Sequence, residues 1–247
     1  MTNKNIAVIG CLGKMGKTLC KYLLSHDEFE FTAGIDTTVS DTSMPPVDRK
    51  GRAIITSDLQ EAIKKADIDI AVDFTAPASV VANAKLCLEN KISMLIGTTG
   101  ISASDTEELA KLAEENRVAL MIVPNFALGA ILMMDFCEKA AKYMPNAEII
   151  ELHHDQKIDK PSGTALKTRL RMAEVTKVKD NELEEKIPIH SVRLPGLVAH
   201  QQVVFGALGQ TLTIKHDSLN RESFMPGIGL ALSQMDTFIG LRSGLKL

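Results

Sequence analysis

Short apolar runs alternate with helix-periodic stretches along the first half of this 247-residue chain. The runs predict strands over residues 6–9, 30–35, 68–72, 92–96 and 118–123. Between them, apolar residues recur at helical spacing, in helices that end near Ser25 and Asn90 and in one that starts at Ser104; Asp58 to Glu61 has the pattern of a helix capping box. Strands and helices that alternate in this way predict a parallel sheet covered on both faces.

The pattern changes after residue 124. Long helices are predicted over 128–144 and 165–178, and an apolar helix over 228–239. A strand over 147–153 is followed by period-two strands over 190–194, 199–205 and 210–217, joined by short turns such as Gly206 to Gly209. We expect the last three to form an antiparallel meander that joins the first in one open mixed sheet. Its second face must be hidden, and Leu212 and Ile214 beside Val203 and Phe205 suit packing on a copy of the chain.

A glycine turn links the first strand to the first helix. Its spacing, Gly10, Gly13 and Gly16, is G-x-x-G-x-x-G rather than G-x-G-x-x-G, because Cys11 occupies the place of the expected first glycine. Such a turn rests a pyrophosphate on the helix N-terminus, and an acid about 20 residues further on binds the adenosine ribose and repels a 2′-phosphate. Asp36 stands at that distance, although a solvated turn aspartate is the alternative. The chain is therefore predicted to be α/β, with a Rossmann-type doubly wound parallel sheet and a second α+β domain.

Polar and glycine-rich segments follow several of the predicted parallel strands. In such sheets ligands gather at the carboxyl ends of the strands. The segments there are Gly10 to Gly16, Asp36, Phe74-Thr75, Gly97 to Thr99 and Pro124 to Phe126. Each could be a plain connection, but their convergence predicts a nucleotide crevice. Residues 37–52 are read as a surface loop beside the adenine pocket.

The richest chemistry lies between residues 151 and 164. A strand ends near His153 and His154, Lys157 follows, and after Pro161 a helix starts from Thr164. Helix N-termini bind carboxylate or phosphate groups, and Gly163 would let a ligand approach the backbone. Imidazole and ammonium groups at that point suit a small anionic substrate that must be protonated. The alternatives are a polar surface loop and a shared metal, which alternation of the two rings along a strand opposes.

Composition narrows the class of protein. A net charge of −3 and the lack of tryptophan argue against a nucleic-acid partner. The four cysteines show no metal-binding spacing, and three of them fall in apolar stretches that suit reduced core residues. The N-terminus shows no signal peptide or membrane span. We expect a cytoplasmic protein with no resident metal and no membrane partner.

The segment His153 to Ala165 resembles the HHxxKxDxPSGTA motif of the dihydrodipicolinate reductase family, and the glycine turn resembles its G-x-x-G-[RK]-M-G loop. Lys160 departs from the family, where a small residue is frequent. The resemblance, which runs from Gly10 to about Leu241, implies NAD(P)H-dependent reduction of 4-hydroxy-tetrahydrodipicolinate to tetrahydrodipicolinate. It also implies homotetramers formed through the second sheet, and a first domain of residues 1–124 and 222–247 around a substrate domain of 125–221.

The resemblance also assigns residues. His153 and Lys157 would act as acid and electrostatic partner, while His154, Ser162, Gly163, Thr164 and Thr99 would hold a small dicarboxylate. The implied cofactor residues are Gly10, Gly13, Lys14, Met15, Gly16, Asp36, Phe74, Gly97, Thr98, Thr99, Pro124, Asn125 and Phe126. Asp36 favours NADH, although Lys14 leaves room for NADPH. Arg193 and His200 are further candidates for substrate contact. Another two-domain dehydrogenase and a catalytically silent nucleotide sensor remain as alternatives.

Overall fold

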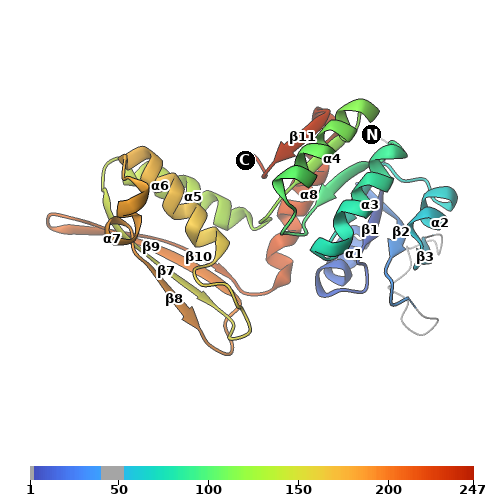
Figure 1. Cartoon of the computed structure of the whole chain (residues 1–247). Coiled ribbons are helices and arrows are strands. Elements are labelled where there is room, and N and C mark those ends of the chain that lie inside the picture. Colours follow the sequence, from blue (N-terminus) through green and yellow to red (C-terminus); the bar gives the residue numbers. More distant parts are fainter. Residues whose placement is uncertain (1–2, 40–52) are drawn as a thin grey trace. The chain divides into compact units, whose positions relative to one another are not determined.

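A computed structural model describes residues 3–39 and 53–247. The chain forms two compact units, of which unit 1 comprises Met1–Phe126 with Met225–Lys246 and unit 2 comprises Ala127–Phe224 with Leu247 (Figure 1). Most of the surface loop expected over 37–52 lies outside the described residues. Within the described ranges, every helix is too short or too polar to cross a membrane.

Unit 1 is built on a seven-stranded sheet in which every pairing is parallel. Its strands are β1 (Lys4–Ile9), β2 (Phe29–Ile35), β3 (Ile54–Thr56), β4 (Ile70–Asp73), β5 (Ser93–Ile96), β6 (Ala119–Ile122) and β11 (Gly240–Ser243). They lie in the order β11-β6-β5-β4-β1-β2-β3. From β1 the chain first adds β2 and β3 on one side and then crosses to add β4, β5, β6 and β11 on the other, so the direction of winding reverses between β1 and β4. The parallel doubly wound sheet predicted from the alternating pattern is confirmed, and ligands of such sheets bind at this reversal.

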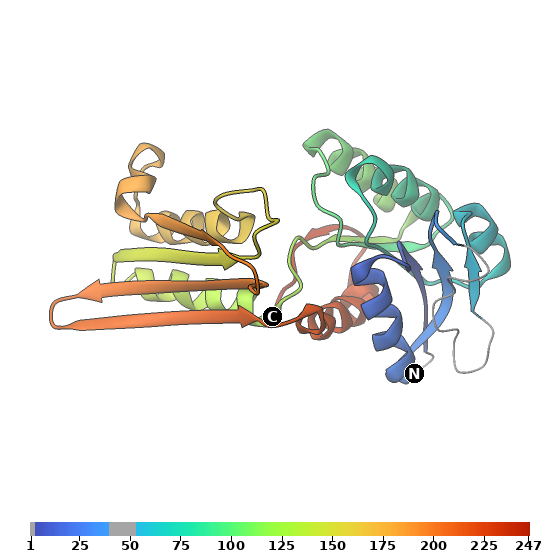
Figure 2. The same ribbon diagram turned by 90° about the horizontal axis from the view of Figure 1, so that it is seen from below.

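Helices cover both faces of this sheet. They are α1 (Lys14–Ser25), α2 (Leu59–Lys65), α3 (Pro77–Glu89), α4 (Ala103–Asn116) and α8 (Met225–Gln234). One core joins α2, α3 and α4 to inward residues such as Ala7 and Ile9, while α1 packs on the opposite face beside α8. Figure 2 shows the green helices on one side and the blue and red helices on the other. Because both faces are covered, the strands read as continuous apolar runs rather than alternating ones.

The end of the chain differs from its prediction. The apolar helix expected over 228–239 ends at Gln234, and a 3₁₀ turn (Met235–Thr237) leads to β11. Gly240, with a φ of +79°, opens this strand, which pairs with β6 at the edge of the sheet. Neither β11 nor β3 was expected. Strand β3 has only three residues, and β11, Gly-Leu-Arg-Ser, lacks the apolar run that marks the other four-residue strands.

Unit 2 has a four-stranded sheet and three α-helices within its described residues. These are α5 (Leu128–Ala141), β7 (Asn146–His153), α6 (Gly163–Thr176), α7 (Leu183–Lys186), β8 (Ile189–Arg193), β9 (Ala199–Ala207) and β10 (Gln210–Ser218), with 3₁₀ turns at Asp180–Glu182 and Arg221–Phe224. The strand order is β10-β9-β7-β8, with β8 parallel to β7. The mixed sheet is confirmed, but the three-strand meander is wrong because β7 lies between β8 and β9. In this order Arg193 stands directly opposite His153.

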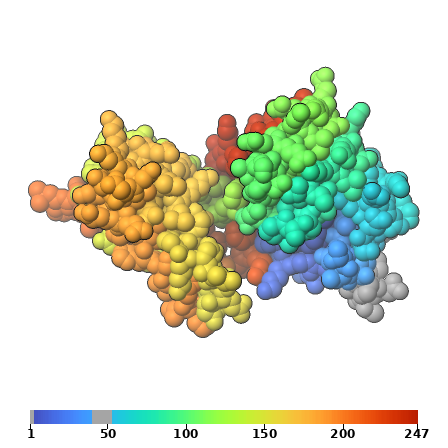
Figure 3. Space-filling model, in the orientation of Figure 1, coloured from blue at the N-terminus to red at the C-terminus, as the bar shows by residue number. Residues whose placement is uncertain are grey.

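The face of the second sheet that was expected to meet another copy lies under a helix of the chain itself. Val203 and Phe205 are fully buried, and Ile214 and Leu212 pair with them in register on the same face. That face lies under α5, since a Cβ on Gly129 of α5 would stand 2.5 Å from the ring of His216, two residues beyond Ile214. The prediction of packing on a copy is therefore wrong for Val203 and Phe205, which are fully buried within the chain. It stays a prediction for Leu212, which is 41% exposed, and for the half-buried Ile214. The turn between β9 and β10 projects from its unit (Figure 3).

The opposite face of this sheet is uncovered within unit 2. It carries the half-buried apolar residues Ile150, Leu152, Val192 and Val204, which alternate along their strands with the helix-covered positions. Polar residues such as Glu148 and His190 border them, joined by a hydrogen bond of 2.8 Å. A sheet face of this composition is a candidate for packing between copies.

Candidate functional site

The glycine turn after β1 is shaped by two close backbone approaches. Gly10 has a φ of +84°, and its N–H donates to the carbonyl oxygen of Ile35 at 2.7 Å. A Cβ on Gly16 would stand 2.0 Å from the carbonyl oxygen of Gly10, so α1 can start only if residue 16 has no side chain. Gly13 is the N-cap of α1 and provides no side-chain hydrogen bond to it. The first amides of α1 can therefore receive an anion from outside.

Asp36 ties the glycine turn to the end of β2. Its carboxylate accepts hydrogen bonds from the N–H of Leu12 at 3.0 Å and from the N–H and hydroxyl of Thr38 at 3.0 and 2.7 Å. Partial burial opposes ionisation, but these hydrogen bonds outweigh it and hold the pKa of Asp36 below its ordinary value. Asp36 is thus a fixed negative charge at the position predicted for ribose recognition.

A cavity of about 440 Å³ lies beside the turn. It is lined by Lys14, Met15, Phe74, Thr75, Pro77, Gly97, Thr98 and Thr99. The turns after β4 and β5 thus meet the start of α1, as the prediction of converging strand ends requires. Thr75 belongs to a segment that was predicted to border the nucleotide crevice, although no cofactor role was assigned to it, whereas Pro77 was not predicted. Pro124 and Asn125 follow β6 and do not line this cavity.

Phe74 occupies the space that Gly97 leaves. A Cβ on Gly97 would lie 2.1 Å from an atom of the Phe74 ring, so the glycine is required by this contact. The Phe74 ring also meets that of Phe126 edge-on, with centroids 5.8 Å apart. Phe126 itself is buried, and it therefore supports the wall of the cavity from behind.

Asp73, the last residue of β4, organises the turns around this cavity and was missed by the sequence prediction. It is fully buried and accepts hydrogen bonds from the hydroxyls of Thr75 and Thr98 at 2.7 and 2.8 Å. The N–H of Thr75 and the amide of Asn83 donate to it at 2.9 Å each. The available signal was an acid that closes an otherwise apolar strand, where an unpaired carboxylate would be costly.

In unit 2 the predicted motif surrounds a second buried carboxylate, that of Glu151. Arg193 binds it in a fork, with NH1 donating to Oε2 at 2.9 Å and NH2 to Oε1 at 2.8 Å. His153 approaches Oε2 through Nδ1 at 2.5 Å, and the N–H of Ser162 donates to Oε1 at 3.3 Å. Burial opposes ionisation of Glu151, yet the bonds from Arg193, Ser191 and His153 hold its pKa below the ordinary value.

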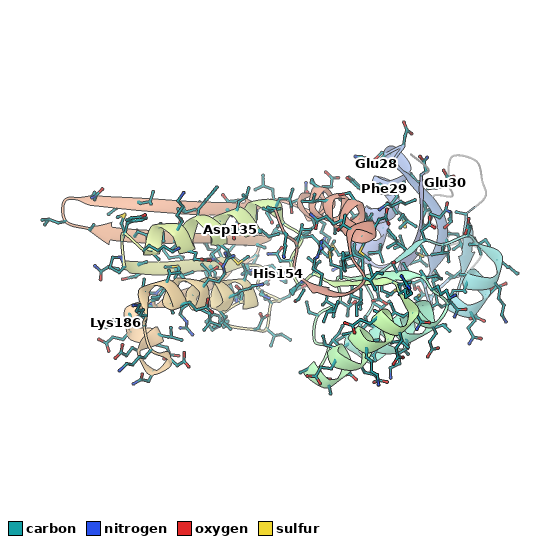
Figure 4. All side chains as sticks on the ribbon, turned by 90° about the horizontal axis from the view of Figure 1, so that it is seen from above. Glu28, Phe29, Glu30, Asp135, His154 and Lys186 are labelled. Carbon is teal, nitrogen blue, oxygen red and sulfur yellow. The ribbon has the colours of Figure 1, made fainter. Side chains whose placement is uncertain are left out.

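The two histidines and the lysine of the motif differ in environment. Burial lowers the pKa of His153 below its ordinary value, although the charge and hydrogen bond of Glu151 act in the opposite direction. His154 is exposed, just beyond the end of β7 (Figure 4). Lys157 is partly buried, and its Nζ donates to Asp159 Oδ1 at 2.7 Å. His153 and Lys157 thus belong to one polar cluster at the end of β7.

The helix start after Pro161 forms close to its predicted position. Ser162 is the N-cap of α6, and its hydroxyl accepts from the N–H of Ala165 at 3.2 Å. The Ser162 side chain is buried and already used as a cap, so the accessible residues at this terminus are Gly163, which is exposed, and Thr164, which is half-buried. A Cβ on Gly163 would meet nothing within 4 Å, so packing within the chain does not require this glycine.

The two further candidates for substrate contact are held by protein partners. The Arg193 side chain is 5% exposed and binds Glu151 and the carbonyl oxygen of Asp159, the latter at 2.6 Å. His200 pairs through Nδ1 with Asp217 at 2.7 Å and accepts from the N–H of Val198 through Nε2 at 3.2 Å. Both residues therefore have structural partners independent of any ligand. Among the predicted substrate residues, Thr99 belongs to unit 1 and the others to unit 2.

Comparison with known proteins covers both units. The family models described as dihydrodipicolinate reductase, N-terminus and C-terminus, match residues 4–126 and 129–244. A 4-hydroxy-tetrahydrodipicolinate reductase of Moorella thermoacetica is 44% identical over 98% of this chain and 96% of its own. The enzyme of that name from Halalkalibacterium halodurans is 43% identical over 96% of this chain and 94% of its own.

A solved structure is also similar over nearly its whole length. It is the dipicolinate-bound dihydrodipicolinate reductase from Paenisporosarcina sp. TG-14, with a TM-score of 0.84, 38% identity and 98% of both chains covered. The resemblance carried by the two motifs thus extends through both units, and the chain belongs to the dihydrodipicolinate reductase family.

Proposed function

We propose that the protein catalyses the NAD(P)H-dependent reduction of 4-hydroxy-tetrahydrodipicolinate to tetrahydrodipicolinate, with loss of water, in lysine and diaminopimelate biosynthesis. The observation that carries this proposal is the cluster at the end of β7, where His153 and Lys157 stand with the start of α6 in a chain that also has a dinucleotide crevice. The relatives from Moorella and Halalkalibacterium carry the name of this activity.

The residues of unit 1 fit a nicotinamide dinucleotide. The uncapped start of α1 after Gly13 suits the pyrophosphate, and Asp36 suits the ribose hydroxyls. Phe74 and Gly97 to Thr99 line the adjoining cavity, and Pro124 to Phe126 follow the neighbouring strand β6. When bound, the reduced nicotinamide supplies the hydride. The chain's own part is to seat the dinucleotide and to exclude water from that half of the site.

The residues of unit 2 fit a small dicarboxylate, and the relative from Paenisporosarcina was solved with dipicolinate bound. One carboxylate would bind the backbone and hydroxyl donors at Ser162, Gly163 and Thr164, in the favourable field of the α6 N-terminus. His154 and Thr99 would help to fix the ring. Lys157 would balance the charge that develops as hydride arrives, and His153 would supply the proton.

NADH is the proposed preferred cofactor. Asp36 keeps its negative charge at neutral pH because hydrogen bonds hold its pKa low, and a 2′-phosphate would be repelled there. Lys14, which lines the cavity, offers a cation and leaves NADPH as a second substrate. Measurement of kcat/KM for both cofactors tests this preference, and equal values would show that Asp36 does not discriminate.

We further propose a cytoplasmic homotetramer assembled through the uncovered face of the second sheet. The apolar residues Ile150, Leu152, Val192 and Val204 supply the contact, in place of Val203 and Phe205, which are buried on the other face of the sheet. The four buried free thiols suit a reducing compartment. Light scattering of the wild type and of Val204→Lys tests the assembly, since a charge on this face should release smaller species.

A coupled assay tests the reaction itself. Dihydrodipicolinate synthase generates the unstable substrate, and oxidation of NADH is followed by absorbance. Turnover would exclude the silent nucleotide sensor, and dependence on the synthase would exclude a dehydrogenase of different specificity. Pyridine-2,6-dicarboxylate should bind more tightly once NADH is present, and a purified protein without synthase-dependent turnover would remove the proposal.

A further inference from the structure

We infer that Glu151, clamped by Arg193, is a positioning residue that keeps a proton on Nδ1 of His153 and leaves Nε2 as the nitrogen that exchanges protons with the ligand. The inference rests on the proposed function, since it concerns the group that supplies the proton in that reaction. It adds to the cluster a residue that touches neither substrate nor cofactor.

The direction of the hydrogen bond follows from the chemistry of the acceptor. An ionised carboxylate has no proton to donate, so a nitrogen bonded to it must carry the hydrogen. Glu151 is fully buried, and the fork of Arg193 on both its oxygens keeps it ionised. Nδ1 of His153, at 2.5 Å from Oε2, is therefore the N–H in the neutral and in the charged ring alike.

Nε2 is consequently the atom whose protonation can change. It makes no hydrogen bond with any residue of its unit that the structure describes. In the proposed reaction the substrate's hydroxyl first leaves as water together with a proton of the substrate. Hydride then adds to a substrate carbon, and the electron pair left on the substrate takes the proton from Nε2 as the N–H bond breaks. The ring then becomes neutral with Nδ1–H still bound to Glu151, and solvent returns a proton to Nε2 for the next turnover.

Arg193 extends the same positioning to the lysine. Its guanidinium also donates to the carbonyl oxygens of Asp159 at 2.6 Å and Val192 at 2.7 Å. Asp159 in turn accepts from Lys157 at 2.7 Å, and the N–H of Ser162 reaches Glu151. One buried ion pair therefore connects the ends of β7 and β8, the segment that carries Lys157, and the start of α6.

The first experiment locates the proton without any change to Glu151. The full-length protein is labelled with ¹⁵N-histidine, and long-range proton–nitrogen spectra are recorded across pH, with the His153 signals identified by their loss in His153→Gln. The expected spectrum at high pH shows a protonated Nδ1 and an unprotonated Nε2. A neutral ring protonated on Nε2 would overturn the inference, whatever the activity of the protein.

The second experiment measures what the carboxylate contributes to turnover. The charged groups that face His153 are Glu151 on its own strand, Arg193 on β8 and Lys157 in the following segment. Glu151→Gln removes the negative charge among them, so the imidazolium becomes less stable and its pKa falls further. Because the acid must be protonated, the high-pH limb of the kcat profile should move to lower pH. We expect kcat to fall by about 10- to 10⁴-fold, the upper figure being the loss seen elsewhere when a catalytic imidazole takes the wrong tautomer.

Two comparisons separate positioning from general damage. Glu151→Asp keeps the charge on a shorter side chain and should restore the position of the pH limb, with kcat between the wild type and Glu151→Gln. Glu138→Gln is the matched control, because it removes a carboxylate from Arg171 on the same unit while Asp135 still pairs with that arginine. It should keep the wild-type kcat and pH profile, and all variants should bind NADH with unchanged Kd.

The outcomes distinguish this inference from the proposed function. Wild-type turnover together with an unchanged pH limb in Glu151→Gln would overturn the inference and leave the function intact. No turnover by the wild type would remove the function, while the nitrogen spectra still decide where the proton lies. If Glu151→Gln does not fold, the wild-type spectra still show which ring nitrogen of His153 carries the proton. A proton on Nδ1 supports the inference, and a proton on Nε2 alone overturns it.

Discussion

The two candidate half-sites of this chain are built on different physical principles. In unit 1 the crevice depends on how closely backbone segments approach, with Gly16 set against the carbonyl oxygen of Gly10 and Gly97 against the ring of Phe74. In unit 2 the cluster at the end of β7 depends on paired charges, with the buried Glu151 held by Arg193. The first is a matter of space and the second of electrostatics.

This difference determines how each half-site fails. A crevice made by close approach is disrupted by an added methyl group, because the neighbouring backbone cannot yield. A cluster made by a buried ion pair tolerates added volume at its open side but not the loss of one charge, which leaves the other uncompensated. Substitutions of opposite kinds should therefore affect the two units selectively.

The largest effect is expected where the proposed chemistry lies. His153→Ala or Lys157→Ala should lower kcat by about 10² to 10⁴-fold, the usual contribution of a positioned acid. The Kd of NADH should barely change, because both residues belong to unit 2. Steady-state kinetics and fluorescence titration of NADH measure the two quantities. A variant with near-full kcat would remove that residue from the proposed mechanism.

The next largest effect tests the electrostatic half of the comparison. Arg193→Ala should destabilise the protein by about 3–5 kcal/mol, since it leaves the carboxylate of Glu151 buried without its partner. Urea unfolding measures the loss, and hydrogen exchange should place it in β7 and β8. Arg171→Ala is the control, because its pairs with Asp135 and Glu138 are partly exposed and should cost about 1 kcal/mol or less. Equal losses in the two variants would contradict the special status of the buried pair.

Two glycine substitutions compare the half-sites directly. Gly16→Ala places a Cβ 2.0 Å from a backbone oxygen and should cost about 1–3 kcal/mol of stability, together with weaker NADH binding. Gly163→Ala meets nothing within 4 Å, so stability should hold while pyridine-2,6-dicarboxylate binds more weakly. Thermal unfolding and titration calorimetry provide both measurements. If Gly163→Ala unfolds as readily as Gly16→Ala, the distinction between the half-sites fails.

The smallest expected effect is on the pH dependence of stability. The folded-state pKa of Glu151 lies below its ordinary value, so its stabilising contribution is complete above the ordinary pKa of a glutamate. The contribution is lost as the pH falls through the lower folded value. The free energy of unfolding of the wild type, measured in urea, should therefore fall as the pH is lowered, and it should fall less in Glu151→Gln. Parallel curves for the two proteins would argue that this carboxylate is not selectively stabilised.

Local patterns were sufficient for much of the fold and for the positions of the candidate residues. The alternation of apolar runs and helices predicted the parallel sheet, since each strand–helix unit is encoded within about 30 residues. The turn from Gly10 to Gly16 and the helix start at Ser162 are likewise encoded by neighbours in sequence. Where the chemistry is local, the prediction needs no knowledge of the rest of the chain.

Non-local pairings were beyond the reach of these patterns. Nothing near β8 reveals that it lies beside β7, or that Arg193 meets Glu151, 42 residues away. The same limit hid the covered face of the second sheet, because Leu212 and Val204 are both apolar but lie on opposite faces. Glu151 reads as an ordinary acid, and the position of Asp73 at the end of an apolar strand was its only signal in the sequence. The fold shows that both carboxylates are fully buried and surrounded by donors.

The order of the units along the chain has a consequence for synthesis. Unit 1 is interrupted after Phe126 and resumes at Met225, so α8 and β11 leave the ribosome only after all of unit 2. Until then one face of the parallel sheet lacks α8 and the edge beside β6 stays unpaired. A nascent chain that stalls between these points would expose apolar surface of unit 1 to chaperones. Unit 2, whose segment is complete by Phe224, can fold before unit 1 is finished.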